Sequence, residues 1–180
     1  MEPSDAALLA RARRAYEQGR LQAALWRAAP LVPVVAWTWS WCRYPALAAL
    51  CGAALVVLTV AFSWRGQVWG RAVVPGLAAG LAPLVLPFLM RGASDVCVGE
   101  MCCSLCLLGC VGGGLVAGAL VGRRAASLVE GRAAFLAAAG TLALLAGAPA
   151  CAFAGMIGLT GLVLGFAGGT APVLLARAPA

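Results

Sequence analysis

The cysteines of this sequence are spaced so that they could bind a metal ion or form disulfides. The stretch CVGEMCCSLCLLGC, residues 97–110, holds five of the eight cysteines, and Cys102 and Cys103 are adjacent. Thiolates bind soft ions such as copper(I), mercury(II) and zinc(II), and residues four apart on a helix share one face. We therefore predict a soft-metal site whose ligands are Cys97, Cys102, Cys103 and Cys106.

The adjacent pair carries a family resemblance. Cys102-Cys103 followed by a glycine-rich apolar segment resembles the vicinal-thiol helix of mercuric-ion membrane transport proteins. The resemblance implies uptake, export or sensing of a soft ion. It covers only these two residues, and those proteins are shorter, have fewer spans and have no outer loop to match Cys97.

Two other uses of the thiols stay open. Cys103-Ser104-Leu105-Cys106 is a C-x-x-C at an expected helix start, where the helix dipole lowers the pKa of the first thiol. Its four residues resemble those of membrane disulfide-generating enzymes of the vitamin K epoxide reductase type, which implies a thiol oxidoreductase. The simpler alternative is a structural or regulatory membrane subunit with disulfides in its outer loops, for example from Cys97 to Cys151 or Cys42.

A ridge of small residues continues from the cysteines. Cys102, Cys106 and Cys110 recur every four residues, and glycines continue the same spacing. Small residues let membrane helices approach closely, and cysteine behaves there as a small hydrophobe. We predict that helix packing is the role of Cys110, Gly114, Gly118 and Gly122. The candidate partners are Gly76 and Gly80, Gly140 and Gly147, or Gly161, Gly165 and Gly169.

The elements that must position these residues are membrane helices. The chain is 63% hydrophobic and 11% charged, which is typical of a membrane protein. A helix needs about 20 apolar residues to cross the hydrocarbon core. We predict an all-α polytopic bundle of about six transmembrane helices over residues 28–176, with Pro75, Pro83 and Pro87 favouring kinks in the third. The six segments are Leu31–Trp41, Ala46–Phe62, Val73–Met90, Met101–Gly122, Ala133–Ala150 and Ala152–Ala176.

Arginine sets the predicted orientation. With a cytoplasmic N-terminus, eleven of the thirteen arginines lie inside, and only Arg43 and Arg91 lie outside. This bias agrees with the positive-inside rule and requires an even number of crossings. We expect a multi-pass protein of the cell membrane, specifically the bacterial inner membrane. Both termini are then cytoplasmic, residues 177–180 form a short tail, and every cysteine falls in the outer half.

Residues 1–27 differ in composition from the rest. Arg13, Arg20 and Arg27 recur at intervals of seven, beside apolar residues at helical spacing. This pattern predicts a basic amphipathic helix that lies on the anionic lipid head groups of the cytoplasmic leaflet. The alternative is a topology anchor with no binding role.

Several function classes are disfavoured. The chain contains no histidine, which removes the commonest general base. It also lacks the G-x-x-x-x-G-K-[ST], H-E-x-x-H and G-x-S-x-G motifs. The sequence therefore favours a non-enzymatic role, with no cofactor beyond a soft metal ion. The arginines follow membrane topology, so nucleic acid is excluded as a partner; a membrane protein partner or a second copy stays open.

Overall fold

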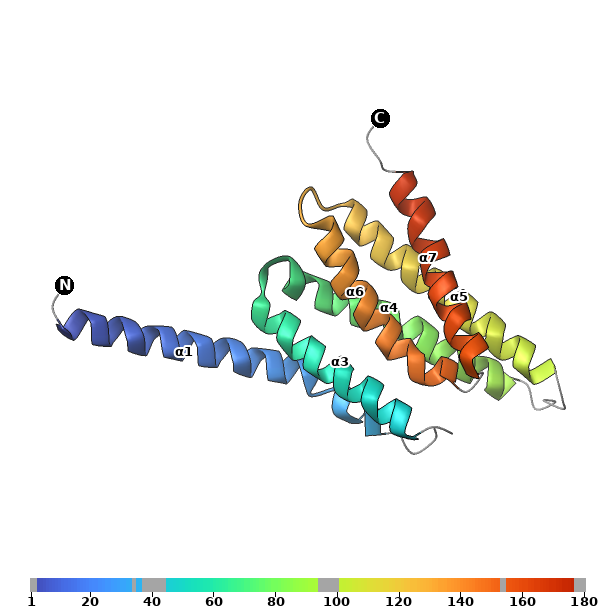
Figure 1. Ribbon diagram of the computed structural model, residues 1–180, viewed down its shortest axis with the longest axis horizontal. Coiled ribbons are helices and arrows are strands. Elements are labelled where there is room, and N and C mark those ends of the chain that lie inside the picture. The colour runs from blue at the N-terminus through green and yellow to red at the C-terminus, as the bar shows by residue number, and fades with distance from the viewer. Residues whose placement is uncertain (1–2, 34, 37–44, 94–100, 153–154, 177–180) are drawn as a thin grey trace.

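The structure is a computed structural model that describes residues 3–33, 35–36, 45–93, 101–152 and 155–176. Every regular element within these ranges is a helix, which confirms the all-α prediction for this part of the chain. Figure 1 shows the helices gathered into a bundle from which the first one projects. They are α1 (Pro3–Ala28), α3 (Pro45–Arg65), α4 (Gln67–Ala93), α5 (Met101–Ala126), α6 (Arg132–Cys151) and α7 (Gly155–Leu175).

Five of the described helices, α3 to α7, are long and apolar enough to cross a membrane. They correspond to the second to sixth predicted segments and indicate a multi-pass membrane protein. The first predicted segment, Leu31–Trp41, includes residues 34 and 37–41, which lie outside the described residues. A sixth crossing therefore stays a prediction.

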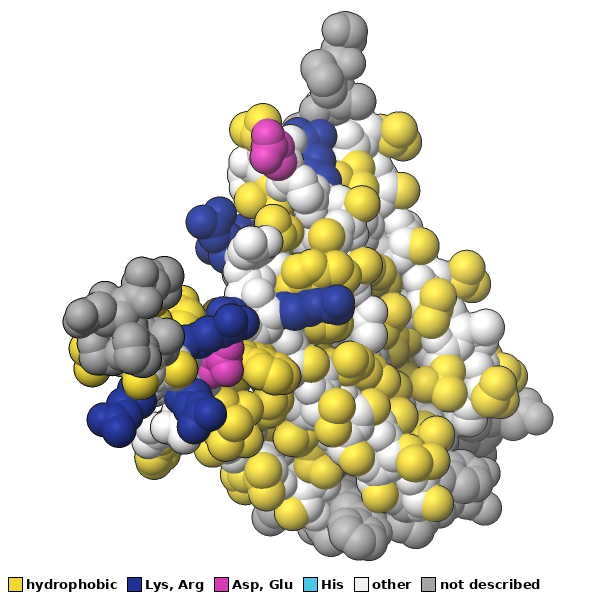
Figure 2. Space-filling model, turned by 60° about the vertical axis from the view of Figure 1, so that its left-hand side comes forward, with side chains coloured by type: hydrophobic (Ala, Val, Ile, Leu, Met, Phe, Trp, Pro, Cys, Tyr) yellow, Lys and Arg dark blue, Asp and Glu magenta, His cyan; other side chains and the backbone are white. Residues whose placement is uncertain are grey.

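The bundle has two chemically different ends. One end, here called the arginine end, holds the end of α3, the start of α4, the end of α5 and the start of α6. A Cβ on Gly131, before α6, would lie 2.9 Å from Val68 of α4, so these segments meet. Arg65, Arg71, Arg123, Arg124 and Arg132 all belong to this end. Figure 2 shows arginines on α1 and on the upper part of the bundle.

Glycine and arginine complete the helix ends there. Gly66 has a φ of 69°, the left-handed conformation that ends a helix at low cost in glycine, and its N–H donates to the Phe62 carbonyl at 3.1 Å. Arg132 donates from Nε to the Leu128 carbonyl at 2.7 Å and from Nη2 to the Ala126 carbonyl at 3.2 Å. Its positive charge at the end of α5 also suits the helix dipole.

The glycines of α5 lie against the backbone of α7. A Cβ on Gly114 would lie 2.5 Å from the Leu162 carbonyl oxygen, and one on Gly118 would overlap the Phe166 carbonyl. The Thr170 hydroxyl lies 2.7 Å from the Phe166 carbonyl of α7 and 3.2 Å from the Gly118 carbonyl of α5, so its one proton is shared between acceptors on the two helices. Gly114 meets Leu162, and Gly118, one turn later, meets Phe166, so α5 and α7 run parallel.

The glycines of α7 lie in turn against the backbone of α5. A Cβ on Gly165 would overlap the Val111 carbonyl, and one on Gly169 would overlap the Leu115 carbonyl. Each ridge therefore fits beside the other helix at a separation that only hydrogen side chains permit. Figure 1 shows α5 and α7 side by side.

Helices α4 and α6 form a second close pair. A Cβ on Gly76 would lie 2.9 Å from the Ala139 Cα, and one on Gly80 would lie 2.6 Å from the Ala146 Cβ. Helix α4 continues as one helix through Pro75 and Pro83. The buried Pro83 lies over Gly147 of α6, whose added Cβ would be 2.7 Å from the Pro83 Cγ, and against Gly113 of α5. The ring thus occupies space that these two glycines leave.

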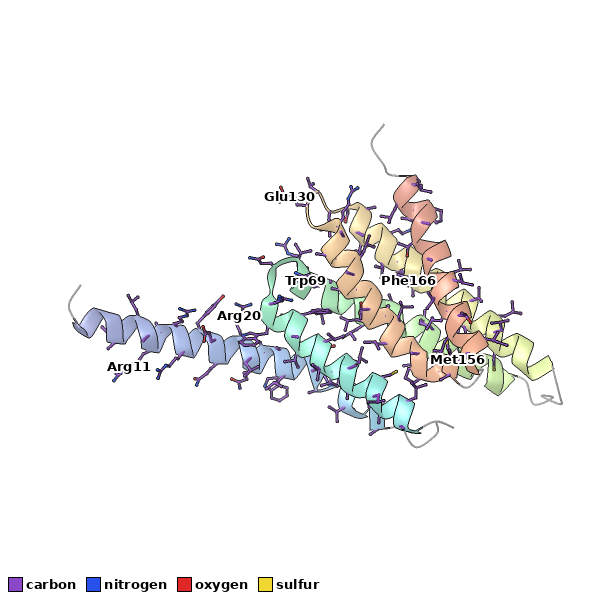
Figure 3. All side chains as sticks on the ribbon, in the orientation of Figure 1. Arg11, Arg20, Trp69, Glu130, Met156 and Phe166 are labelled. Carbon is purple, nitrogen blue, oxygen red and sulfur yellow. The ribbon has the colours of Figure 1, made fainter. Side chains whose placement is uncertain are left out.

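Helix α1 contacts the bundle through its C-terminal half. Ala24 and Ala28 are buried, and the Arg20 guanidinium donates to the Trp64 carbonyl at the end of α3. In Figure 3 Arg20 lies near the turn between α3 and α4, whereas Arg11 lies on the part that projects away. The helix ends at Ala28, one residue past the predicted amphipathic segment 1–27.

Candidate functional site at the cysteine end

The end opposite the arginines, here called the cysteine end, holds the start of α5, the end of α6 and the start of α7. Helix α5 begins at Met101, so Cys102, Cys103 and Cys106 belong to its first two turns. The half-buried Cys106 is the one predicted ligand whose side chain is described. Cys97, and the side chains of Cys102 and Cys103, lie outside the described residues.

Two deeper cysteines meet between α5 and α6. The thiols of Cys110 and Cys151 hydrogen-bond to each other, and both residues are 0% exposed. They are not joined in a disulfide. Leu162 of α7 belongs to the same buried cluster, so residues of three helices meet here. The result is a dry two-thiol contact inside the bundle.

Cys106 connects this pair to the helix end. It precedes Cys110 by one helical turn, about 6 Å along the axis, and interacts electrostatically with the Cys151 thiol. Because Cys106 is half-buried and the other two are buried, the three cysteines lead from the surface into the interior. We call Cys106, Cys110 and Cys151 the thiol ladder.

The sequence did not predict the partner of Cys110. It placed Cys151 in an outer turn between two spans, whereas Cys151 is the last residue of α6 and is buried. The sequence did indicate that Cys110 and Cys151 lie on the same side of the bilayer midplane, since both were expected in the outer half of the membrane. Depth alone cannot pair them, because it does not give the rotation of each helix about its axis. Cys51, on α3, also lies in the half of its helix nearer the cysteine end.

The ladder supports two kinds of chemistry. Two thiolates from different helices can hold a soft ion with bonds of about 2.3 Å, or they can be oxidised to a disulfide. In the ranges that the structure describes, no three cysteine, aspartate or glutamate side chains are arranged to hold a metal ion. A higher-coordinate site would therefore need cysteines beyond those whose side chains are described.

A separate apolar groove lies beside the first part of the chain. Its volume is about 400 Å³, and α3, α4 and α6 line it together with Arg27, Pro30, Leu31 and Val35. Arg27 is the one charged residue in its wall. Comparison of the chain with protein-family models, curated proteins and solved structures finds no match.

Proposed function

We propose that this membrane protein binds a soft metal ion through Cys97 and the three cysteines in the first two turns of α5, namely Cys102, Cys103 and Cys106. The observation that carries the proposal is that α5 begins at Met101, because Cys102 and Cys106 then lie one turn apart on the same face of this helix. A thiol-rich path without histidine or a described carboxylate favours soft ions over magnesium or calcium. Transport or sensing of copper, mercury or zinc is the corresponding role.

A second candidate function rests on the contact between Cys110 and Cys151. Hydrogen-bonded thiols on two helices are positioned to form a bridge, which would suit a structural or regulatory membrane subunit. In the third candidate, a thiol oxidoreductase, a disulfide between Cys103 and Cys106 would exchange with two thiols of a substrate, which would become a disulfide as Cys103 and Cys106 return to thiols. Its support is that α5 begins at Met101, which puts Cys103 in the first turn.

Counting thiols on the purified protein, with and without reductant, separates these candidates. Metal binding requires reduced cysteines, so all eight thiols should react with a thiol reagent in denaturant. Two or more oxidised pairs that appear only after reduction would instead favour the bridged subunit or the oxidoreductase.

Titration of the reduced protein in detergent with copper(I) or mercury(II) tests the ligand set. Changing a group that merely orients a ligand costs about 10–100-fold in metal affinity, so losing a ligand should cost at least that much. We expect such losses for Cys102→Ser, Cys103→Ser and Cys106→Ser. Cys51→Ser, on α3, and Cys110→Ala, in the packing ridge, should bind nearly as well as the wild type.

Equal losses of metal affinity in Cys110→Ala and Cys106→Ser would indicate that the ion binds deeper in the bundle, at the thiol ladder. A flat response across all the variants would end the metal proposal and leave the thiols to packing or bridging.

The proposed topology has six crossings and both termini in the cytoplasm. Its support is that the chain before α3 runs antiparallel to α3: Arg20 contacts Trp64, and further along Val35 contacts Gly52. In intact cells, a membrane-impermeant thiol reagent should label Cys97 after mild reduction, and a reporter fused at Ala180 should stay inside. External exposure of the Ala180 reporter with Cys97 unlabelled would invert the arrangement.

A further inference from the structure

A groove at the arginine end has two cations at its mouth. It lies mainly between α4 and α5 and has a volume of about 460 Å³. Arg71 of α4 and Arg124 of α5 both line it, and both side chains are exposed. Two helices that meet as neighbours thus direct one guanidinium each to a common cavity.

No carboxylate compensates these charges within the described residues. Among the described residues, the one ion pair joins Arg13 and Glu17 on α1. Glu130, in the loop after α5, is not among the residues that line the groove. Guanidinium groups bind phosphate through paired, charge-assisted hydrogen bonds. The mouth of the groove therefore suits a phosphate-bearing anion.

The inner part of the groove is apolar. Val74 and Ala78 follow Arg71 along α4, about 4.5 and 10 Å deeper at 1.5 Å per residue, and Leu120 lies about 6 Å from Arg124 along α5. Val74 is 67% exposed and Leu120 is 46% exposed, so the groove opens on the side of the bundle. In a multi-pass membrane protein that side faces acyl chains. A soluble phosphate would use only the mouth, whereas a phospholipid would use both parts.

We propose that this groove binds one anionic phospholipid, with its phosphate between Arg71 and Arg124 and an acyl chain along Val74, Ala78 and Leu120. Basic pockets between membrane helices bind anionic head groups by this combination of charge and apolar contact. The site is distinct from the thiol ladder, which lies at the opposite end of the bundle. It is also distinct from the surface binding expected of the basic N-terminal segment.

Native mass spectrometry of the full chain in detergent tests the charged half of the site. Phosphatidylglycerol should bind more tightly than phosphatidylcholine with the same acyl chains. Arg71→Gln and Arg124→Gln should each weaken phosphatidylglycerol binding about fivefold, and the double variant about thirtyfold. The matched control is Arg123→Gln, an exposed neighbour on α5 that does not line the groove. It should bind as the wild type does.

A second variant tests the apolar half. Leu120→Trp places a larger side chain in the groove without entering the core, because Leu120 is partly exposed. We expect it to lose phosphatidylglycerol binding while its thermal unfolding stays that of the wild type. Inorganic phosphate should not displace the lipid, since it cannot occupy the apolar wall.

Four results would overturn the proposal. One is equal binding of phosphatidylcholine and phosphatidylglycerol, and another is an equal loss in Arg123→Gln and Arg124→Gln. The third is full binding by Leu120→Trp, which would place the lipid elsewhere on the surface. The fourth is displacement by inorganic phosphate, which would identify a site for a soluble anion.

Discussion

Replacing Gly118 by alanine is expected to separate α5 from α7 and to destabilise the bundle by about 2 kcal/mol or more. The added Cβ would overlap the Phe166 carbonyl and lie 2.9 Å from the Thr170 hydroxyl oxygen. Backbone cannot move aside as a flexible side chain can, so the helices must part. The hydrogen bond from Thr170 to the Gly118 carbonyl would be lost with that movement. Gly118→Leu should be more severe still.

Gly168→Ala is the matched control for Gly118→Ala, because the added Cβ there overlaps no backbone atom. Gly168 of α7 is exposed, and its added Cβ would meet only the Leu115 Cδ2, at 3.5 Å. Alanine is a better helix former than glycine by about 1 kcal/mol, so Gly168→Ala should leave stability unchanged or raise it slightly. The two variants thus have opposite expected signs.

Thermal unfolding in detergent, followed by tryptophan fluorescence, measures both variants. A midpoint for Gly118→Ala at or above that of Gly168→Ala would show that α5 and α7 do not approach closely at this position.

Hydropathy predicted where the membrane helices lie but not where they end. The predicted fourth segment stops at Gly122, whereas α5 continues to Ala126. Apolar composition marks only the part of a helix suited to the hydrocarbon core. Arg123 and Arg124 are good helix formers that extend the helix beyond it, and Arg132 then donates to the carbonyls of Ala126, the last residue of α5, and of Leu128 just after it. Boundaries of this kind depend on contacts between segments.

The small-residue ridge was visible in the sequence, but its partner was not. Three spans offered glycines, and nothing in their spacing separates Gly76 and Gly80 from the others. In the structure, α7 faces α5, while Gly76 and Gly80 lie against α6. The choice depends on how all the helices share one bundle, because α4 cannot present the same glycines to two neighbours. Comparing the glycines of two spans at a time does not reveal that constraint.

For the candidate sites too, the sequence predicts the depth of a residue in the membrane but not its angular position around the helix axis. Counting residues along each span placed Cys110 and Cys151 in the same half of the membrane, but only the packed helices bring the two thiols into contact. Arg71 and Arg124 were both assigned to the cytoplasmic side, and only the structure shows that they line one groove. The depth of a residue follows from its number, whereas its angular position depends on which helix faces lie buried.

The pH dependence of metal binding is the second large effect that we expect. A thiol has an ordinary pKa of about 8.5 and must lose its proton to bind a soft ion. Below that pKa, each thiolate ligand makes the apparent affinity fall tenfold per pH unit. A site with two thiolates should therefore lose between about three and four orders of magnitude in affinity between pH 8 and pH 6.

The slope of that profile counts the ligands, which makes it a sharper test of the Cys97–Cys106 cluster than affinity alone. Competition with a chromophoric copper(I) chelator of known pH dependence measures it. If Cys106 is a ligand, Cys106→Ser should lower the slope by one order of magnitude in affinity per pH unit, whereas Cys110→Ala should leave it unchanged. The opposite pattern would assign the ion to the Cys110 and Cys151 pair. A profile that changes only near the ordinary carboxyl pKa of about 4.3 would point instead to an oxygen ligand, for which Glu100, directly before Met101 in the same stretch, is the candidate. Copper would then be held by oxygen, and the thiols of residues 97–110 would act in packing or bridging.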